Sequence, residues 1–193
     1  MNNNLAYLRE GREELINGRI VAMSPAATNH NRVAGNIFLL FGSYLKGKPC
    51  IPFGDGEKVF LTETDHFVPD FMVVCDRDKI KADGVHGAPD LVVEILSPST
   101  GMHDKGRKKR VYERCGVSEY WIVSPEARSV DVYLLEEGRF ELRGSYSVYP
   151  DYMLIHMTEE EKAEMVTEFY CHLYDDLPIR LDDIFSDIFS DMF

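Results

Sequence analysis

The segments Val68-Pro-Asp-Phe-Met-Val-Val74 and Leu91-Val-Val-Glu-Ile-Leu96 both have the apolar composition of buried β-strands, and each carries one carboxylate, Asp70 or Glu94. An ionised carboxylate among apolar neighbours is costly unless another group pairs with it. A divalent cation would satisfy that need. The two acids therefore indicate a chemical site as well as a sheet.

Strand alternation tells which neighbours each acid has. Asp70 shares a face with Met72, and Glu94 shares a face with Val92, because side chains two residues apart lie on the same side of a strand. Each acid is therefore expected to point in the same direction as an apolar neighbour. If the two strands pair, their carboxylates can lie side by side.

We expect this pair of acids to bind Mg²⁺ or Mn²⁺ as a cofactor. Both ions prefer hard oxygen ligands, which the two carboxylates, waters and a backbone carbonyl such as that of Ile95 would supply. Asp90 competes with Asp70, but four residues along one strand put its Cα about 13 Å from that of Glu94. We therefore predict Asp70, Glu94 and Ile95 as metal ligands, and Asp90 as a poor co-ligand.

A basic helix is predicted between the turn at residues 97–101 and Cys115. Asp104, Lys108 and Tyr112 recur in it at four-residue spacing, so they lie on one helix face. An ammonium on this face can reach the two acids. In phosphodiester hydrolysis it would stabilise the added charge or orient the attacking water.

The rest of the chain supplies the elements of an α/β fold. Asn17-Gly18 between short apolar segments predicts a type I′ hairpin, and apolar periodicity after an N-cap at Thr28 predicts a helix that Gly47 ends. The order of hairpin, helix, strands, helix and strands predicts a central sheet flanked by helices. Strands are expected around residues 59–61, 68–75, 90–96, 119–125, 130–135 and 140–142.

The C-terminal segment is predicted to be helical. Thr158-Glu-Glu-Glu161 has the arrangement of a capping box, and the apolar spacing up to Leu173 predicts an amphipathic helix over residues 158–174. The end of the chain, residues 183–193, repeats an Ile-Phe pair. It predicts a helix that docks either on its own body or on a second copy.

The net charge of −12 is concentrated in the same segment. Residues 151–193 hold twelve acids against Lys162 and Arg180, a net of −10, which leaves −2 for the first 150 residues. Residues 101–114 carry six bases against two acids, a net of +4. The acidic tail therefore does not exclude a phosphate-bearing ligand, although one basic helix predicts weak, salt-sensitive non-specific binding.

The 193 residues are enough for a single domain, with a core over about 11–145 and an acidic extension over about 151–193. The four cysteines form no CxxC pair, so we interpret them as free thiols in a reducing cytosol. The start lacks a basic segment followed by an apolar stretch, and the longest apolar run, Ile37 to Phe41, is too short to span a membrane. We expect a cytoplasmic protein without a membrane partner.

Each candidate residue also has a simpler interpretation. Asp70, next to Pro69, is compatible with a turn or strand start, and Lys108 with a solvated helix position. His30 falls on the apolar face of its helix, where a histidine is more often a core residue than a ligand. Tyr120-Trp121 favours core packing over a base-stacking platform. The chain has no GxSxG sequence, so serine hydrolysis is disfavoured.

Six motifs follow one another along most of the chain: Glu14-Leu-Ile-Asn-Gly18, Asn29-His30, Val68-Pro-Asp70, Ala88-Pro-Asp-Leu-Val-Val-Glu-Ile-Leu-Ser-Pro-Ser-Thr100, Asp104 to Tyr112 and Gly116-Val-Ser-Glu-Tyr-Trp121. In these motifs the chain resembles the Uma-type putative restriction endonuclease family, a branch of the PD-(D/E)xK nuclease superfamily. The resemblance implies a restriction-endonuclease-like core and a metal-dependent nuclease site. Asp70 and Glu94 match its acidic ligands, and Lys108 matches a lysine from the following helix.

Further residues match the cleft around that site. The resemblance implies that Glu14 and His30 also line this cleft. Asp104 and Tyr112 share the helix face of the candidate lysine.

The sequence departs from the superfamily pattern in two places. The usual lysine lies two residues after the glutamate, where this chain has Leu96, so the choice of Lys108 depends on the helical variant, with Lys105 and Lys109 as close competitors. The predicted helix at 158–174 is also longer than expected before the family-like ending at residues 177–185. It is interpreted as an insertion with its own partner.

The sequence thus predicts a Mg²⁺-dependent endonuclease with Asp70, Glu94 and Lys108 as catalytic residues. Its expected partner is nucleic acid, with DNA preferred although no residue pattern separates DNA from RNA. A homodimer is expected, because cutting both strands of a duplex commonly uses two sites related by a two-fold axis. The alternative is a non-catalytic dimeric or partner-binding module on the same fold, which uses the acidic helix and the Ile-Phe repeat as its contact surface.

Overall fold

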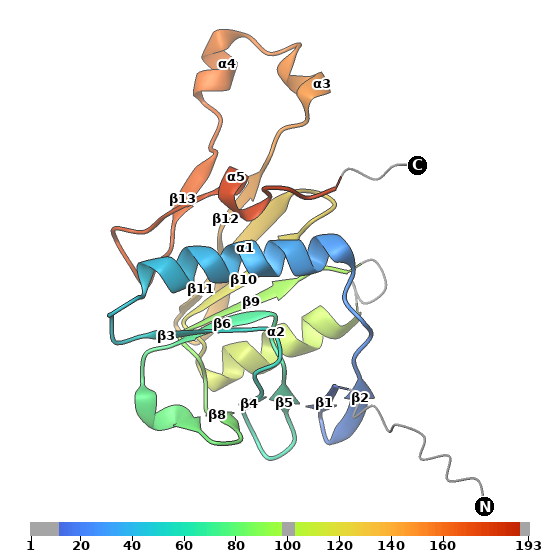
Figure 1. Cartoon of the computed structure of the whole chain (residues 1–193), viewed down its shortest axis with the longest axis vertical. Helices are drawn as coiled ribbons and strands as arrows, with labels where there is room; N and C mark the ends of the chain where they lie inside the picture. The colour runs from blue at the N-terminus through green and yellow to red at the C-terminus, as the bar shows by residue number, and fades with distance from the viewer. Residues whose placement is uncertain (1–11, 98–102, 190–193) are drawn as a thin grey trace, which may run out of the picture.

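The computed structural model describes residues 12–97 and 103–189, apart from the side chains of residues 103–105 and 151 (Figure 1). The N-terminal hairpin is confirmed, because Asn17 and Gly18 have φ values of 52° and 73°, as a type I′ turn requires. The elements in chain order are β1 (Glu13–Ile16), β2 (Arg19–Ala22), α1 (Thr28–Tyr44), β3 (Ile51–Gly54), β4 (Val59–Phe60), β5 (His66–Phe67), β6 (Phe71–Val74), η1 (Arg77–Lys79), β7 (Ile80–Lys81), β8 (Gly84–His86), β9 (Leu91–Ile95), α2 (His103–Cys115), β10 (Glu119–Ser124), β11 (Ser129–Glu136), β12 (Arg139–Ser147), α3 (Asp151–Leu154), α4 (Glu159–Ala163), β13 (Glu168–Tyr170), β14 (Pro178–Arg180) and α5 (Leu181–Ile184).

A mixed six-stranded sheet of order β12-β11-β10-β9-β6-β3 forms the centre, as predicted. Only β9 and β10 are parallel neighbours within it, and α2 connects them, since parallel strands need a crossover connection. Helix α1 covers one face of this sheet and α2 the other (Figure 1). The predicted α/β class with flanking helices is therefore confirmed.

Each helix builds its own core against the sheet. Ile37 and Phe41 of α1 pack in one cluster, and Tyr112 of α2 packs in the other. Tyr120 and Trp121 are adjacent in β10 and point into opposite clusters, both fully buried. Their interpretation as core residues is confirmed.

A second six-stranded sheet, of order β2-β1-β5-β4-β8-β7, packs against the α2 side. Ile16 of β1 and Phe67 of β5 share the cluster that contains Tyr112. This packing brings the N-terminal hairpin, which is remote in sequence, to the same region as α2 and the central sheet. It is the reason that β1 contributes to the site described below.

The predicted start of α1 at an N-cap on Thr28 is wrong by one residue. The helix begins at Thr28, and the N-cap is Ala27, which makes no side-chain capping hydrogen bond.

The predicted helix over 158–174 is wrong beyond its first turns. The capping box is present, since Thr158 and Glu161 bond reciprocally, but α4 ends at Ala163. Phe169 lies instead in β13, paired with Ile179 of β14 and buried. Valine, threonine and aromatic side chains in this stretch favour a pleated, half-buried strand, and tertiary packing of Phe169 overrides the helical spacing.

The predicted terminal helix over 183–193 is also wrong within the described residues. Helix α5 ends at Ile184, which is buried against the α1 side of the sheet. Asn36 donates to the carbonyl oxygens of Ile184 and Ser186, and Arg32 contacts Asp187 at 2.7 Å. This part of the tail therefore docks on its own body, and residues 190–193 lie outside the described part.

Two of the four cysteines are not free thiols, which corrects the sequence interpretation. Cys50 and Cys75 form a disulfide, whereas Cys115 and Cys171 are free. The two bonded residues flank the antiparallel pair Ile51 and Val74, so the sheet sets them opposite each other. Sequence spacing did not reveal this pairing, and the cysteines no longer argue for a reducing compartment.

Candidate active site

Asp70 and Glu94 come from neighbouring strands of the central sheet. Strands β6 and β9 are antiparallel with Phe71 opposite Val93, a register that sets Asp70 opposite Glu94. Asp70 stands directly before β6 rather than inside it, which corrects the predicted strand start, and Glu94 lies within β9. Both are buried, with 7% and 8% of their surface exposed. The pairing that sequence alternation made possible is thus present.

Asp70 is held by a backbone group and by a histidine. The Ile95 amide donates to its Oδ2 at 2.6 Å, and His30 Nε2 lies 3.2 Å from its Oδ1. His30 is therefore a partner of the Asp70 carboxylate as well as a buried residue of α1. Burial lowers its pKa, but the contact with the Asp70 carboxylate outweighs burial, so the pKa of His30 is raised overall.

Lys108 reaches the acids from α2. Its Nζ lies 3.2 and 3.3 Å from the two carboxylate oxygens of Glu94, and Tyr112 donates to Glu94 Oε1 at 2.8 Å. The competitor Lys109 instead places its Nζ 3.3 Å from the centre of the Tyr133 ring. The other competitor, Lys105, has a side chain outside the described part.

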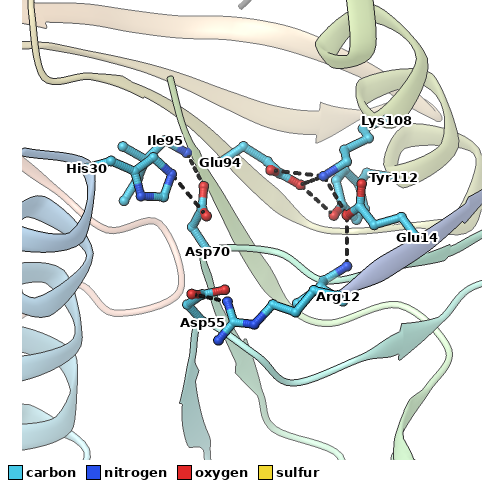
Figure 2. A network of polar contacts seen from close by, with 10 residues as sticks. Arg12, Glu14, His30, Asp55, Asp70, Glu94, Ile95, Lys108 and Tyr112 are labelled. Atoms are coloured by element: carbon cyan, nitrogen blue, oxygen red, sulfur yellow. Dashed lines mark hydrogen bonds and ion pairs between the residues drawn. The ribbon is translucent and has the colours of Figure 1, made fainter. Parts of the chain in front are cut away.

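Glu14 brings a third carboxylate from β1. Its Oε1 lies 2.7 Å from Lys108 Nζ and accepts the Val68 amide at 2.9 Å. Figure 2 shows Glu14 and Glu94 converging on Lys108, with Tyr112 beside them. The resemblance indicated Glu14 as a cleft residue, but only the packing of the second sheet brings it to the lysine.

Burial of the side chains is the largest single influence on the pKa values in this cluster. Burial raises the pKa of Glu94 to about 7; the Lys108 charge opposes that rise, and the nearby acids Asp70 and Glu14 add to it. Burial lowers the pKa of Lys108, but the carboxylates of Glu94 and Glu14 outweigh it and raise the pKa overall. The site therefore carries more negative charge than the Lys108 ammonium can compensate.

Two other residues considered from the sequence, Asp90 and Asp104, make no described contact with this cluster. Asp90 accepts the Cys75 amide at 2.7 Å, at the opposite end of β9 from Glu94, which agrees with its exclusion. Asp104 lies in the first turn of α2, but its side chain is outside the described part.

Sequence reasoning missed the ion pair between Arg12 and Asp55 beside this cluster (Figure 2). The contact joins residues far apart in the chain, and no local spacing signals it.

The donor set fits a hard divalent cation. Within the described residues no group of three or more His, Cys, Asp or Glu side chains has the arrangement of a metal-ligand cluster. Mg²⁺, however, is usually bound through one or two carboxylates, with waters and substrate phosphate completing its octahedron. Two opposed, buried carboxylates with an incompletely compensated charge meet that requirement.

No helix in the described part of the chain is long and apolar enough to cross a membrane.

The chain is similar to known proteins of one family. Residues 5–148 match the model of the Uma2 family, described as "Putative restriction endonuclease". Two relatives come from Synechocystis sp. (strain ATCC 27184 / PCC 6803 / Kazusa). The chain is 32% identical to "Uncharacterized protein slr1290", in a match that covers 63% of this chain and 65% of that protein. It is 26% identical to "Uncharacterized protein sll1609", in a match that covers 63% of this chain and 71% of that protein. The chain thus spans slightly less than two thirds of the first relative.

A solved structure supports the fold. The chain superposes with a TM-score of 0.70 on a crystal structure titled as a putative nuclease belonging to DUF820 from Anabaena variabilis ATCC 29413. The match covers 92% of this chain and 91% of that one at 20% sequence identity. At that identity the likeness establishes a shared architecture alone.

Proposed function

Because the chain belongs to the Uma2 family of putative restriction endonucleases, we propose that it is a metal-dependent endonuclease that hydrolyses phosphodiester bonds in DNA. The observation that carries the proposal is the convergence of Asp70, Glu94 and Lys108 from three elements into one buried cluster. Two acids and a lysine are a minimal set for cation-assisted hydrolysis.

The acids would hold Mg²⁺ or Mn²⁺. Asp70 and Glu94 provide the charged ligands, and the backbone carbonyl of Ile95 is the proposed third protein ligand. When bound, the ion would polarise the phosphate and lower the pKa of a water molecule. His30 and the Ile95 amide fix the Asp70 carboxylate, so its orientation does not depend on the ion.

Lys108 would act on the charge that develops during hydrolysis. Its ammonium is fixed between Glu14 and Glu94, and its raised pKa keeps it protonated at neutral pH. A fixed, buried ammonium stabilises an added negative charge without reorganising and can orient the attacking water. Tyr112, one turn further along α2, also donates to Glu94 Oε1, so two side chains of the same helix hold this carboxylate in place.

The test is a cleavage assay with single- and double-stranded DNA and RNA in Mg²⁺, in Mn²⁺ and in chelator. Glu94→Ala is expected to reduce the cleavage rate at least about 100-fold, and chelator to abolish cleavage. Glu126→Gln, an exposed acid in the β10–β11 turn, is the matched control. A folded Glu94→Ala protein that binds Mn²⁺ and cleaves like the wild type contradicts the proposal.

The second candidate function is a non-catalytic dimeric or partner-binding module. It is favoured by one observation, a group of exposed apolar side chains between residues 149 and 170. The same assay separates the two candidates, since a module of this kind binds a partner but cleaves none of the four substrates under any metal condition.

A further inference from the structure

The exposed part of α2 carries a row of three arginines, which we call the arginine stripe: Arg107, Arg110 and Arg114. They follow one another at spacings of three and four residues, so they lie along one side of the helix. This side adjoins the one that carries Asp104, Lys108 and Tyr112. At a rise of about 1.5 Å per residue, the stripe extends about 10 Å along the helix.

The arginine stripe concentrates positive charge that the rest of the described chain does not balance. Like charges three and four residues apart on a helix repel each other and destabilise it. Within the described part, Arg107 and Arg110 form no ion pair, and Arg114 lies 3.6 Å from one acid, Asp65. A row of like charges without partners in its own chain is typical of a surface that binds an anion.

Acids near the stripe set its limits. Glu113 of α2 turns to β12, where its Oε2 accepts the Phe140 amide at 2.7 Å. Asp65 is buried beside Arg114, and the exposed Glu63 stands two residues earlier in the same turn. The basic surface therefore ends at Arg114, and its uncompensated part is the half that contains the other two arginines.

This uncompensated half adjoins the proposed active site. Arg107 directly precedes Lys108, whose Nζ lies 3.2 Å from Glu94 Oε1. The helix thus turns one basic side chain to the buried acids and the neighbouring ones to solvent. A row of phosphates that passes the acids can continue along the stripe. Because one nucleic-acid strand carries a phosphate about every 3.4 Å along the helix axis, the stripe matches about three successive phosphates.

We propose that the arginine stripe binds the sugar–phosphate backbone of one nucleic-acid strand, next to the bond that is cut. The inference rests on the proposed nuclease function, since it takes the strand at Lys108 to be the substrate. Guanidinium groups suit this role, because their planar fork donates two hydrogen bonds to one phosphate. Phosphate contacts carry no sequence information, so the stripe positions the strand without selecting a sequence.

Salt-dependent binding tests the proposal. Fluorescence anisotropy of labelled single-stranded and duplex DNA is measured in chelator, so that binding is observed without metal-dependent cleavage. The stripe variant combines three substitutions: Arg107→Ala, Arg110→Ala and Arg114→Ala. Its Kd at about 50 mM salt is expected to rise at least about 30-fold. The slope of log Kd against log salt is expected to fall by about 2.7 for the duplex and about 2 for the single strand, because three phosphate contacts are lost.

The matched control removes the same charge at three exposed positions outside α2: Lys46→Ala, Arg143→Ala and Arg180→Ala. Its salt slope is expected to change by less than about 0.5. Circular dichroism shows whether both variants are folded.

Three results overturn the proposal: a wild type that binds neither form of DNA, a stripe variant with the salt slope of the wild type, or an equal fall of the slope in the control. These results are separate from the cleavage assay, because no metal is present. Binding that depends on the stripe, in a protein that cleaves nothing in Mg²⁺, supports the stripe and contradicts the nuclease. Cleavage by a protein whose salt slope the stripe variant leaves unchanged does the reverse.

Discussion

Replacement of Lys108 by methionine tests the electrostatic description of the site most directly. The variant keeps the length and apolar stem of the side chain but removes the ammonium that lies 2.7 Å from Glu14 Oε1 and 3.2 Å from Glu94 Oε1. Both partners are buried. Removing one member of a buried ion pair costs about 3–5 kcal/mol, because the remaining charge is left without compensation.

The cost is expected to depend on pH. Glu94 has a folded-state pKa raised to about 7, so its ionised form is disfavoured in the folded protein. The resulting loss of folding free energy is absent at pH values below the pKa of Glu94 in the unfolded chain. It is complete at pH values above the pKa of Glu94 in the folded protein. Loss of the Lys108 charge raises the folded pKa further, so Lys108→Met should lose most stability at pH 8 and much less at pH 5, where Glu94 is protonated.

A divalent cation should restore part of the loss. Mn²⁺ bound to the folded state at 100 times its Kd adds about 2.7 kcal/mol, provided the unfolded chain does not bind it. Because the variant offers the same carboxylates without the competing ammonium, we expect Mn²⁺ to stabilise it at least as much as it stabilises the wild type.

Urea unfolding, followed by the fluorescence of Trp121, measures these values, since this chain has one tryptophan and it is fully buried. Lys46→Met, at an exposed position after α1, is the matched control and should change stability by less than about 0.5 kcal/mol. A Lys108→Met protein within about 1 kcal/mol of the wild type at pH 8 in chelator would refute the reasoning.

Three further outcomes follow from the same structure. Mn²⁺ affinity, measured by calorimetry, should weaken about 100-fold between pH 8 and pH 5, because a ligand with a pKa of about 7 must lose its proton to bind; an affinity independent of pH would remove Glu94 from the ligand set. Glu14→Gln should cost about 1–3 kcal/mol in urea unfolding, since the amide can still accept from Val68 but no longer neutralises Lys108. Reduction of the Cys50–Cys75 disulfide, which closes a separation of 25 residues, should lower the unfolding free energy by about 3 kcal/mol, and unchanged unfolding in reductant would argue against that bond.

Local patterns were sufficient for the elements that carry the site. The hairpin at Asn17-Gly18, the helix from Thr28, strand β9 with Glu94 and strand β6 directly after Asp70 follow from turn chemistry and from periods of 3.6 and 2. These signals need only neighbours in sequence. Asp70 and Glu94 could therefore be selected before their strands were known to pair.

Contacts made by distant segments were not accessible in the same way. Glu14 meets Lys108 only because the second sheet packs on the α2 side, and His30 meets Asp70 because α1 lies across the central sheet. The disulfide between Cys50 and Cys75 depends on the register of β3 and β6. Phe169 was misassigned because its burial against the sheet, rather than its helical spacing, selects a strand.

The register of β6 and β9 connects the fold to the chemistry. With Phe71 opposite Val93, Met72 and Val92 belong to the core on the α2 side, and the next pair outward is Asp70 and Glu94. Side chains alternate between the two faces of a sheet, so a register slip of one residue would turn one of the two acids to the α1 side. The slip would also move the apolar side chains of that strand out of the cores in which they now pack. The apolar pattern that stabilises the sheet thus also holds the two carboxylates together, so their convergence does not require a bound ion.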